Sequence, residues 1–185
     1  MGMIIAITGV PGTGKSTLAR MLGKKLSCDV IGANELVKEK KIWTRKELGV
    51  LVADMDKLAR AIASSLDGKH DAVVEGHLLC DIRVKADAVV VLRTNPEILR
   101  KRLGARRYPK GKIDENVMAE ALDYCTIRAE GNYPKGKVYE VDTTGSLKLS
   151  LIGLEAIAKG EGKKFLPGGI SWEKELEQEA SRVRS

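Results

Sequence analysis

Short apolar runs alternate with amphipathic stretches along most of the chain. The runs have the length of strands buried on both faces of a sheet, and they cover Met3–Thr8, Cys28–Ile31, Ala72–Val74, Ala86–Leu92 and Val138–Val141. Stretches with apolar residues three or four positions apart predict helices over Lys15–Ser27, Asn34–Lys41, Asp54–Leu66, Pro96–Ala105, Asp114–Glu130 and Leu147–Ala158. This alternation predicts an α/β fold, in which a five-stranded parallel sheet carries helices on both faces.

The pattern also divides the chain into a main domain and a tail. Residues 1–159 hold all of the predicted strands, and Asn95 is expected to cap the helix that starts at Pro96. A glycine-rich connection then opens a tail over residues 160–185, in which Ser171 is expected to cap a last helix. The apolar stripe of that helix consists of Trp172, Leu176, Ala180 and Val183. Such a stripe either docks on the core or meets a partner.

The positive charge is concentrated in one segment. The 185 residues carry 32 Lys+Arg and 25 Asp+Glu, a net charge of +7. The segment 98–113 contains seven basic residues and no acid, namely Arg100, Lys101, Arg102, Arg106, Arg107, Lys110 and Lys112. Proteins that wrap nucleic acid spread their basic residues and often interleave aromatic ones, whereas only Tyr108 interrupts this cluster. The cluster better suits a small polyanion such as a nucleoside triphosphate, the alternative being a solvated helix face followed by a loop.

Cysteine spacing and apolar content bear on the compartment. The three cysteines, Cys28, Cys80 and Cys125, have no C-x-x-C spacing, so neither a disulfide framework nor a zinc site is indicated. No apolar run approaches the ~20 residues that span a bilayer, and no basic segment precedes the first apolar run. We therefore expect a cytoplasmic protein with no membrane partner.

A phosphate-binding motif follows the first predicted strand. Residues 9–16 read G-V-P-G-T-G-K-S, which fits G-x-x-x-x-G-K-S/T in full, with Thr17 next. Its glycines let the backbone turn its N–H groups toward a β-phosphate, and the helix that follows adds the positive end of its dipole. Lys15 is expected to bridge the β- and γ-phosphates, Ser16 to hold Mg²⁺, and Thr17 to reach the α-phosphate. The sequence therefore predicts a P-loop NTPase.

Further residues separate the P-loop classes. Asp142–Gly145 spells the D-x-x-G of GTPases but lies at the fifth strand, and no N-K-x-D follows it, so we expect it to line an adenine pocket instead. The strand end with paired acids that is usual in motor ATPases is missing. The layout favours a nucleoside monophosphate kinase, with an acceptor-binding segment over about 32–52. Glu75 ends the third strand beside the phosphate-binding motif of residues 9–16, which we call the cradle. Glu75 would hold the Mg²⁺ water shell there, and His77 would orient a water or the acceptor phosphate.

Four segments together resemble one known family. They are Gly9–Thr17, the Glu75-x-His77 pair, Val91–Thr94, and the Leu103-x-x-Arg106-x-Tyr108 pattern. They are similar to the small adenylate kinases called adenylate kinase isoenzyme six, or CINAP, over about Met3 to Tyr133. The resemblance implies phosphoryl transfer from ATP to AMP, a slower ATPase activity, and a role in small ribosomal subunit assembly with a platform ribosomal protein or rRNA as partner.

The resemblance also implies roles for individual residues. The ATP phosphates would be bound by Gly12, Gly14, Lys15, Ser16 and Thr17. Arg106 would be the arginine of a lid over about residues 105–114, and Lys38, with Glu35, would bind the acceptor. This chain has Glu75 where the family usually has Asp, and Lys38 where an arginine is expected. A lysine does not make the bidentate contact of an arginine, so these two departures bear on the specificity for AMP and not on phosphoryl transfer.

Three functional hypotheses remain after these observations. The first is an adenylate kinase in which the lid brings Arg106, with Arg102 or Arg107, onto the phosphoryl group between ATP·Mg²⁺ and AMP. The second is an ATP-driven assembly factor whose hydrolysis releases a protein or rRNA partner. The third is a kinase for another monophosphate or a small hydroxylated acceptor, because residues 32–52 show no base-reading pattern.

Overall fold

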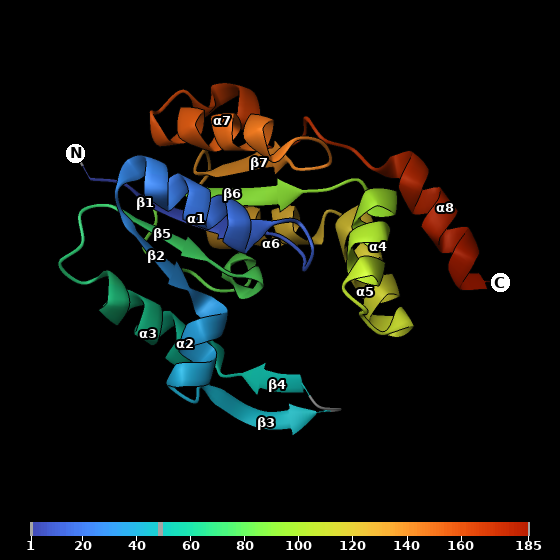
Figure 1. Cartoon of the computed structure of the whole chain (residues 1–185), viewed down its shortest axis with the longest axis horizontal. Helices are drawn as coiled ribbons and strands as arrows, with labels where there is room; N and C mark the ends of the chain where they lie inside the picture. Colours follow the sequence, from blue (N-terminus) through green and yellow to red (C-terminus); the bar gives the residue numbers. More distant parts are fainter. Residues whose placement is uncertain (1, 48–49, 185) are drawn as a thin grey trace.

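The predicted parallel sheet is present. The structure is a computed structural model that describes residues 2–47 and 50–184. Its main sheet has the order β2-β5-β1-β6-β7, and every neighbouring pair is parallel. The strands are β1 (Ile4–Thr8), β2 (Asp29–Gly32), β5 (Ala72–Glu75), β6 (Ala88–Arg93) and β7 (Val138–Asp142). Parallel neighbours need crossover connections, and helices supply them here (Figure 1).

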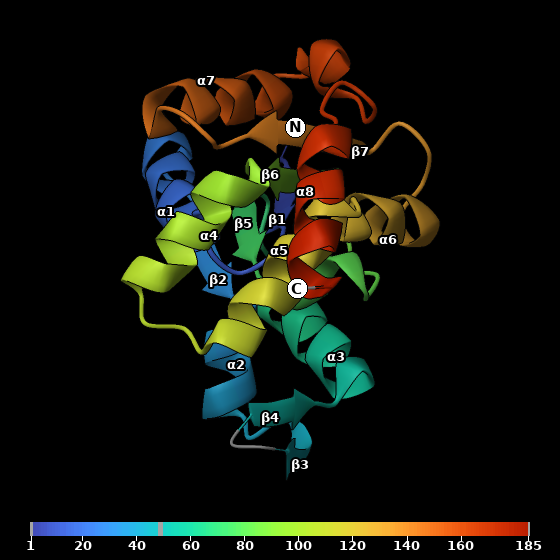
Figure 2. The same cartoon turned by 90° about the vertical axis from the view of Figure 1, so that its right-hand side faces the viewer.

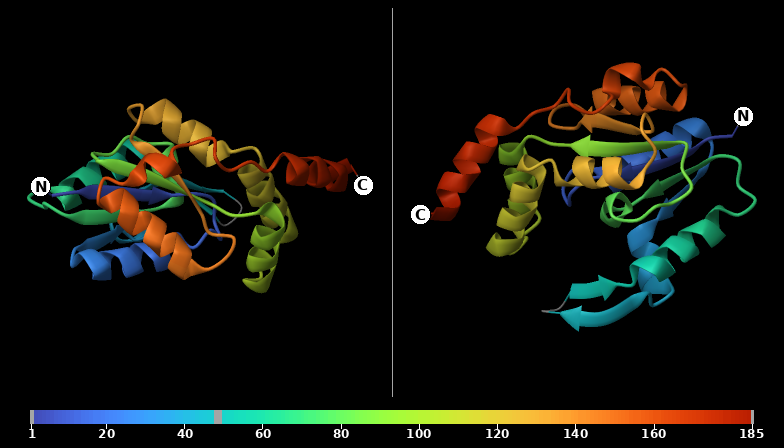
Figure 3. Two further views of the ribbon diagram at one scale, coloured as in Figure 1. Left: turned by 90° about the horizontal axis from the view of Figure 1, so that it is seen from above. Right: turned by 180° about the vertical axis from the view of Figure 1, so that it is seen from behind.

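Helices cover both faces of the sheet, as predicted. Side chains at Ile5 and Ile7 of β1 face a core formed with α1 (Lys15–Leu26) and α7 (Leu147–Ala158). The alternate side chains face a second core that is closed by α3, α4, α5 and α6. These helices cover Met55–Leu66, Pro96–Ala105, Lys110–Ala121 and Tyr124–Asn132. Seen from above, the sheet lies between α1 and α7 on one side and α6 on the other (Figure 3).

The helix predicted over Asp114–Glu130 is two helices in the structure. α5 begins earlier, at Lys110, and the chain breaks at Asp123, whose φ is 55°. A non-glycine residue with positive φ does not continue a right-handed helix, so α6 starts a new direction at Tyr124. The early start of α5 leaves a turn of only four residues, 106–109, between α4 and α5 in the predicted lid.

The predicted acceptor segment, residues 32–52, contains a hairpin that the hydrophobic pattern did not indicate. α2 (Ala33–Glu39) is followed by β3 (Trp43–Glu47) and β4 (Val50–Ala53), which pair antiparallel. Leu48 and Gly49, which belong to this predicted segment, lie outside the described residues. The hairpin is apart from the main sheet, at the lower edge of Figure 1. After it, Asp54 caps α3 by accepting the backbone N–H of Lys57 at 3.0 Å.

The tail docks on the domain rather than extending away from it. After a 3₁₀ turn, η2 (Gly162–Phe165), helix α8 (Glu173–Arg184) lies along α5 (Figure 2). The Nε1 of Trp172 donates to Glu120 at 3.0 Å, and Asn95 donates to Glu175 at 2.7 Å. The predicted cap Ser171 is wrong by one residue, because the first helical hydrogen bond goes to the carbonyl of Trp172. The side chain of Val183 lies outside the described part of the chain.

Two further features concern the helices and the cysteines. Among the described residues, no helix is long and apolar enough to cross a membrane. The three cysteines are free thiols, with Cys80 and Cys125 buried and Cys28 half-buried.

Candidate functional site

The backbone of the motif forms a loop that only glycine permits at several positions. Gly9, Gly12 and Gly14 have φ values of 134°, 98° and 94°. A Cβ at Gly9 would lie 2.6 Å from the carbonyl oxygen of Leu92, and one at Gly12 would lie 2.7 Å from the side chain of Leu99. The loop ends at Lys15, where α1 starts and leaves its first N–H groups free for an anion.

Lys15 lies inside this loop. Its Nζ donates to the carbonyls of Gly9 and Val10, both at 2.9 Å, and only 8% of the residue is exposed. Burial lowers the pKa of Lys15 to about 8, although the nearby Glu75 acts to raise it. The ammonium is therefore charged at neutral pH and has only neutral carbonyls as direct hydrogen-bond partners. Such a charge is well suited to an incoming phosphate.

Ser16 and Glu75 meet at the same place. The Ser16 hydroxyl donates to Glu75 at 2.9 Å, and Glu75 is buried at the end of β5, beside β1. A hydroxyl and a carboxylate oxygen are ligands that Mg²⁺ accepts, together with phosphate oxygens and water. Within the described residues, no group of three or more His, Cys, Asp or Glu side chains could hold a metal. The Ser16–Glu75 pair thus fits a Mg²⁺ ion that arrives with a nucleotide.

One cavity of about 400 Å³ joins most of the predicted site residues. Its lining includes Gly12, Gly14, Lys15, Ser16, Thr17, Glu75, His77 and Arg106. The lining also includes Asn34 of the predicted acceptor segment, Tyr108 of the predicted lid, and Arg20, which the sequence analysis did not place in the site. The helical spacing of Arg20 from Ser16 is the signal that could have found it. We call this space the phosphate cavity.

His77 is a neutral group in the phosphate cavity. Burial, and next the charge of Lys15, lower the pKa of His77 to about 4. At pH 7 its imidazole can orient a water or another polar group by hydrogen bonding, but it adds no positive charge. The described cations of the phosphate cavity are therefore Lys15, Arg20 and Arg106.

A second cavity, of about 360 Å³, adjoins the first and shares Gly12, Gly14, Thr17 and Arg106 with it. It extends to Arg102, Ala105 and Leu147, and we call it the side cavity. Arg102 donates to the carbonyls of Thr143 and Thr144 at 2.7 and 3.2 Å. Within Asp142–Gly145, Thr143 and Thr144 thus hold Arg102, which lines the side cavity, and the expectation that this segment lines an adenine pocket stays a prediction.

The structure does not bring all predicted residues to the phosphate cavity. Glu35 instead lines a separate cavity of about 570 Å³ beside β2. Lys38 is exposed on α2 and lines neither the phosphate cavity nor the side cavity. Arg107, with φ at 58°, also lines neither of them. The acceptor roles of Glu35 and Lys38 therefore stay predictions.

Sequence comparison gives this site its context. A family model described as "AAA domain" matches residues 5–123, more than half of the chain. The protein named "Putative adenylate kinase" of Methanocaldococcus jannaschii is 37% identical over 172 residues, which is 92% of this chain and 93% of that relative. The one of Natronomonas pharaonis is 40% identical over 162 residues, 86% of this chain and 92% of that relative. The chain belongs to the family of these putative adenylate kinases. The narrower assignment to isoenzyme six stays a prediction.

Solved structures show the same fold for this adenylate kinase family member. A gluconokinase from Sinorhizobium meliloti superposes with a TM-score of 0.58 at 18% identity, covering 86% of this chain and 95% of its own. A shikimate kinase from Bacteroides thetaiotaomicron also has a TM-score of 0.58, at 16% identity, covering 86% and 99%. At these identities the likeness concerns the fold, which is that of P-loop kinases, and the acceptor must be argued from the site.

Proposed function

We propose that this protein transfers the γ-phosphoryl group of ATP to AMP, forming two ADP. The observation that carries the proposal is the phosphate cavity, where the cradle with Lys15, the Ser16–Glu75 pair and Arg106 line one space of about 400 Å³. Membership in the family supports it. The side cavity adjoins the cradle on the side of α4 and α7, and its size and place suit the nucleoside of ATP.

In this proposal the acceptor phosphate oxygen attacks the γ-phosphorus of ATP. A new P–O bond forms, the bond from the γ-phosphorus to the oxygen of the β-phosphate breaks, and the first ADP leaves with that oxygen. Little covalent chemistry is required of the protein, which positions the two nucleotides and stabilises negative charge. Lys15 and the backbone N–H groups of the loop would bind the β- and γ-phosphates.

Mg²⁺ would be held at Ser16 and Glu75 in this proposal, since their oxygens already point at each other 2.9 Å apart. When bound, the ion supplies charge neutralisation between the β- and γ-phosphates. Glu75 reaches the pair from the end of β5 and Ser16 from the start of α1, so the pairing of β5 with β1 and the loop from β1 to α1 bring the two oxygens together.

Arg106 is exposed in the turn between α4 and α5, at the edge of the phosphate cavity. No hydrogen bond or ion pair of its side chain is found among the described residues. We propose that it reaches the transferring group when the lid, residues 105–114, closes over the nucleotides. An arginine that contacts the phosphoryl group mainly in the transition state accelerates transfer by about 10³-fold or more.

Two other hypotheses use the same cradle. An ATP-hydrolysing switch in ribosome assembly would need a protein or rRNA partner to trigger hydrolysis, and this idea depends on the sequence resemblance to isoenzyme six. A kinase for a different monophosphate or a hydroxylated acceptor would use the same cradle and differ in the residues that bind the acceptor.

The test is to incubate the purified protein with Mg²⁺ and ATP, with and without AMP, and to quantify ADP and free phosphate. The proposal predicts two ADP for each AMP consumed and little free phosphate. Free phosphate that does not respond to AMP but rises with a partner would contradict it and favour the switch. Preparations of Lys15→Met protein serve as the control for contaminating kinases, and a panel of other acceptors tests the third hypothesis.

A further inference from the structure

Arg20 is a free cation at the edge of the phosphate cavity. It lies on α1 one helical turn after Ser16, its side chain is exposed, and it lines the same space as Glu75 and His77. Among the described residues, no hydrogen bond, ion pair or ring contact involves the Arg20 guanidinium. An arginine beside a phosphate site with no protein partner is available to bind a planar anionic group such as phosphate.

The other two cations of the phosphate cavity already have roles at the donor. Lys15 is enclosed by the cradle, where it donates to the carbonyls of Gly9 and Val10. Arg106 lines both the phosphate cavity and the side cavity, so it stands where the donor phosphates meet the donor nucleoside. Two nucleotides in one site bring more negative charge than these two cations and one Mg²⁺ can neutralise. Among the cations that line the phosphate cavity, Arg20 is the one that remains.

The two cavities also distinguish the end of the site that would hold ATP from the end that would hold the acceptor. They share Gly12, Gly14 and Thr17 of the cradle, and the side cavity continues toward α4 and α7. Arg20 and Asn34 line the phosphate cavity and not the side cavity, and Asn34 belongs to the first turn of α2. If ATP fills the side cavity and the cradle, the group that accepts the phosphoryl must enter from the end with Arg20 and Asn34.

A close contact fixes Asn34 at that end. Gly76, between Glu75 and His77, packs so tightly on the first turn of α2 that a Cβ there would lie 2.6 Å from the Cβ of Ala33. The missing side chain lets α2 start next to the carboxyl end of β5, and Asn34 follows Ala33 into the phosphate cavity. Lys38 lies one turn further along α2, outside the cavity.

We infer that Arg20 and Asn34 form the acceptor end of the site, with Arg20 binding the phosphate of a nucleoside monophosphate and Asn34 hydrogen-bonding the same group. The inference rests on the proposed function and deepens it by naming the residues that select the acceptor. A free guanidinium at this end selects for an acceptor with an anionic phosphate and gives no advantage to an uncharged hydroxyl acceptor. It assigns to Arg20 the role that the sequence analysis expected of Lys38.

The experiment compares Arg20→Ala, Arg20→Lys and Lys38→Ala with Lys24→Ala, an exposed α1 lysine that lines neither cavity. For each variant the KM for AMP and the KM for ATP are measured separately. Loss of one charge-assisted contact raises the KM for AMP by about 10- to 100-fold in Arg20→Ala, with the KM for ATP changed by less than about 3-fold. Arg20→Lys recovers part of the loss, because a lysine keeps the charge but not the bidentate contact.

Several results would overturn the inference. One is a KM for ATP that rises as much as the KM for AMP, which would put Arg20 at the donor. Another is a large effect of Lys38→Ala with none of Arg20→Ala.

Direct binding separates a failure of this inference from a failure of the proposed function. Calorimetry measures AMP binding to wild-type and Arg20→Ala protein in the presence of Mg²⁺ and a non-hydrolysable ATP analogue. If wild-type protein makes no ADP but binds AMP, and Arg20→Ala does not, the proposed reaction is wrong while the acceptor end stands. If wild-type protein binds neither AMP nor any other nucleoside monophosphate, the acceptor end is wrong as well.

Discussion

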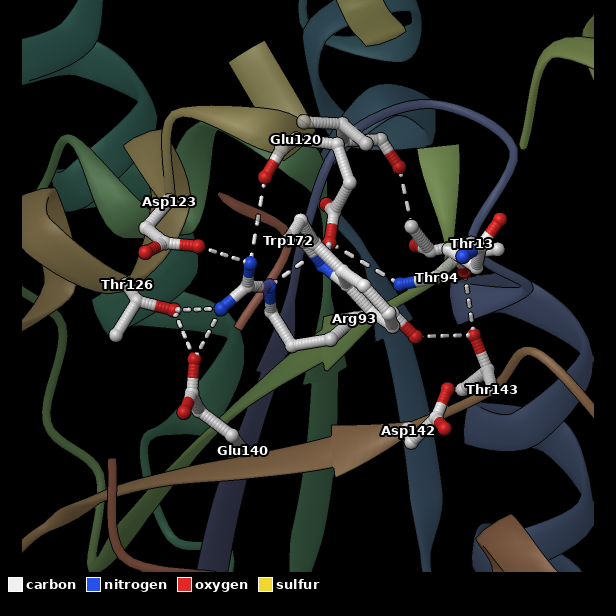
Figure 4. Close-up of polar contacts among 12 residues, drawn as sticks. Thr13, Arg93, Thr94, Glu120, Asp123, Thr126, Glu140, Asp142, Thr143 and Trp172 are labelled. Carbon is white, nitrogen blue, oxygen red and sulfur yellow. Dashed lines mark hydrogen bonds and ion pairs between the residues drawn. The ribbon is translucent and has the colours of Figure 1, made fainter. Parts of the chain in front are cut away.

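Two regions that contain cations lie at the carboxyl ends of neighbouring strands, and they differ in whether those cations form ion pairs within the protein. Beside β1, the phosphate cavity holds Lys15, Arg20 and Arg106. At the end of β6, Arg93 is 1% exposed, and its guanidinium donates to the carboxylates of Glu120, Asp123 and Glu140 (Figure 4). Trp172 also lies against this guanidinium, with its ring centroid 6.0 Å away.

The two regions differ in whether carboxylates of the protein neutralise the cations. Burial acts to lower the pKa of Arg93, but Glu120 and the other carboxylates outweigh it and raise that pKa, so the guanidinium stays charged. The cations of the phosphate cavity have no such ion pairs among the described residues. A buried charge such as that of Lys15 is costly without a partner, so a bound anion would stabilise it. Charge alone therefore does not mark a functional site, and what distinguishes the phosphate cavity is that cations without an ion pair to any described residue line one space together.

The Arg93 cluster has a structural role that follows from its contacts. Glu120 belongs to α5 and Glu140 to β7. Glu120 accepts the backbone N–H of Thr94 and the indole N–H of Trp172, and Glu140 accepts the N–H of Gly168 in the tail. One arginine thus connects the main sheet, the helix that carries the lid, and the C-terminal segment.

Matched substitutions by methionine test this comparison most directly, and the larger effect on function is expected at Lys15. Lys15→Met removes the ammonium while roughly keeping the volume, and kcat/KM for ATP falls by about 10³-fold or more. The free energy of unfolding at pH 7 stays the same or rises. Folding lowers the pKa of Lys15 from 10.5 to about 8, so keeping it charged below that pH costs folding free energy.

Steady-state kinetics and urea unfolding on the same preparation check both parts of this expectation. Near-normal turnover would contradict the role of the cradle. A clear loss of stability would contradict the view that Lys15 is kept for ligand binding at the expense of folding.

Arg93→Met is expected to show the reverse pattern. It leaves Glu120 and Glu140 buried without their cation, which costs about 3–5 kcal/mol of stability. Molecules that remain folded keep their KM for ATP, because Arg93 does not line the phosphate cavity. Thermal unfolding and kinetics below the melting temperature measure the two quantities. A large rise in KM with unchanged stability would show that the cluster serves the reaction.

The pH dependence of ATP binding gives the smallest expected effect. Lys15 of the ligand-free protein loses its proton as the pH rises through about 8, so ATP affinity declines above that pH by up to about 10-fold per unit. Calorimetry between about pH 7 and about pH 9.5 measures the decline, and Lys15→Arg, whose charge does not titrate there, is expected to flatten it. An affinity of wild-type protein that does not change over this range would contradict the role of Lys15.

Local features of the sequence predicted the parts of the structure that depend on neighbouring residues. The apolar runs gave the five strands, the glycine spacing gave the cradle, and Asn95 caps α4 by accepting the N–H of Glu97 at 3.0 Å. The break at Asp123 was missed, because Asp123 leaves the helical conformation where its carboxylate binds Arg93, 30 residues earlier. No periodicity over a short window reports such a contact.

The sequence by itself determined the fold class, the position of the phosphate cradle and the residues that we propose bind a triphosphate, because each of these follows from spacing within a few residues. Only the tertiary structure decided which residues lie at the proposed acceptor end of the cavity. That choice depends on Arg20 of α1, Asn34 of α2 and Gly76 after β5, and the packing of a sheet edge brings these residues together. It also decided which arginines are free, since the partners of Arg93 and Arg102 come from strands and loops far along the chain.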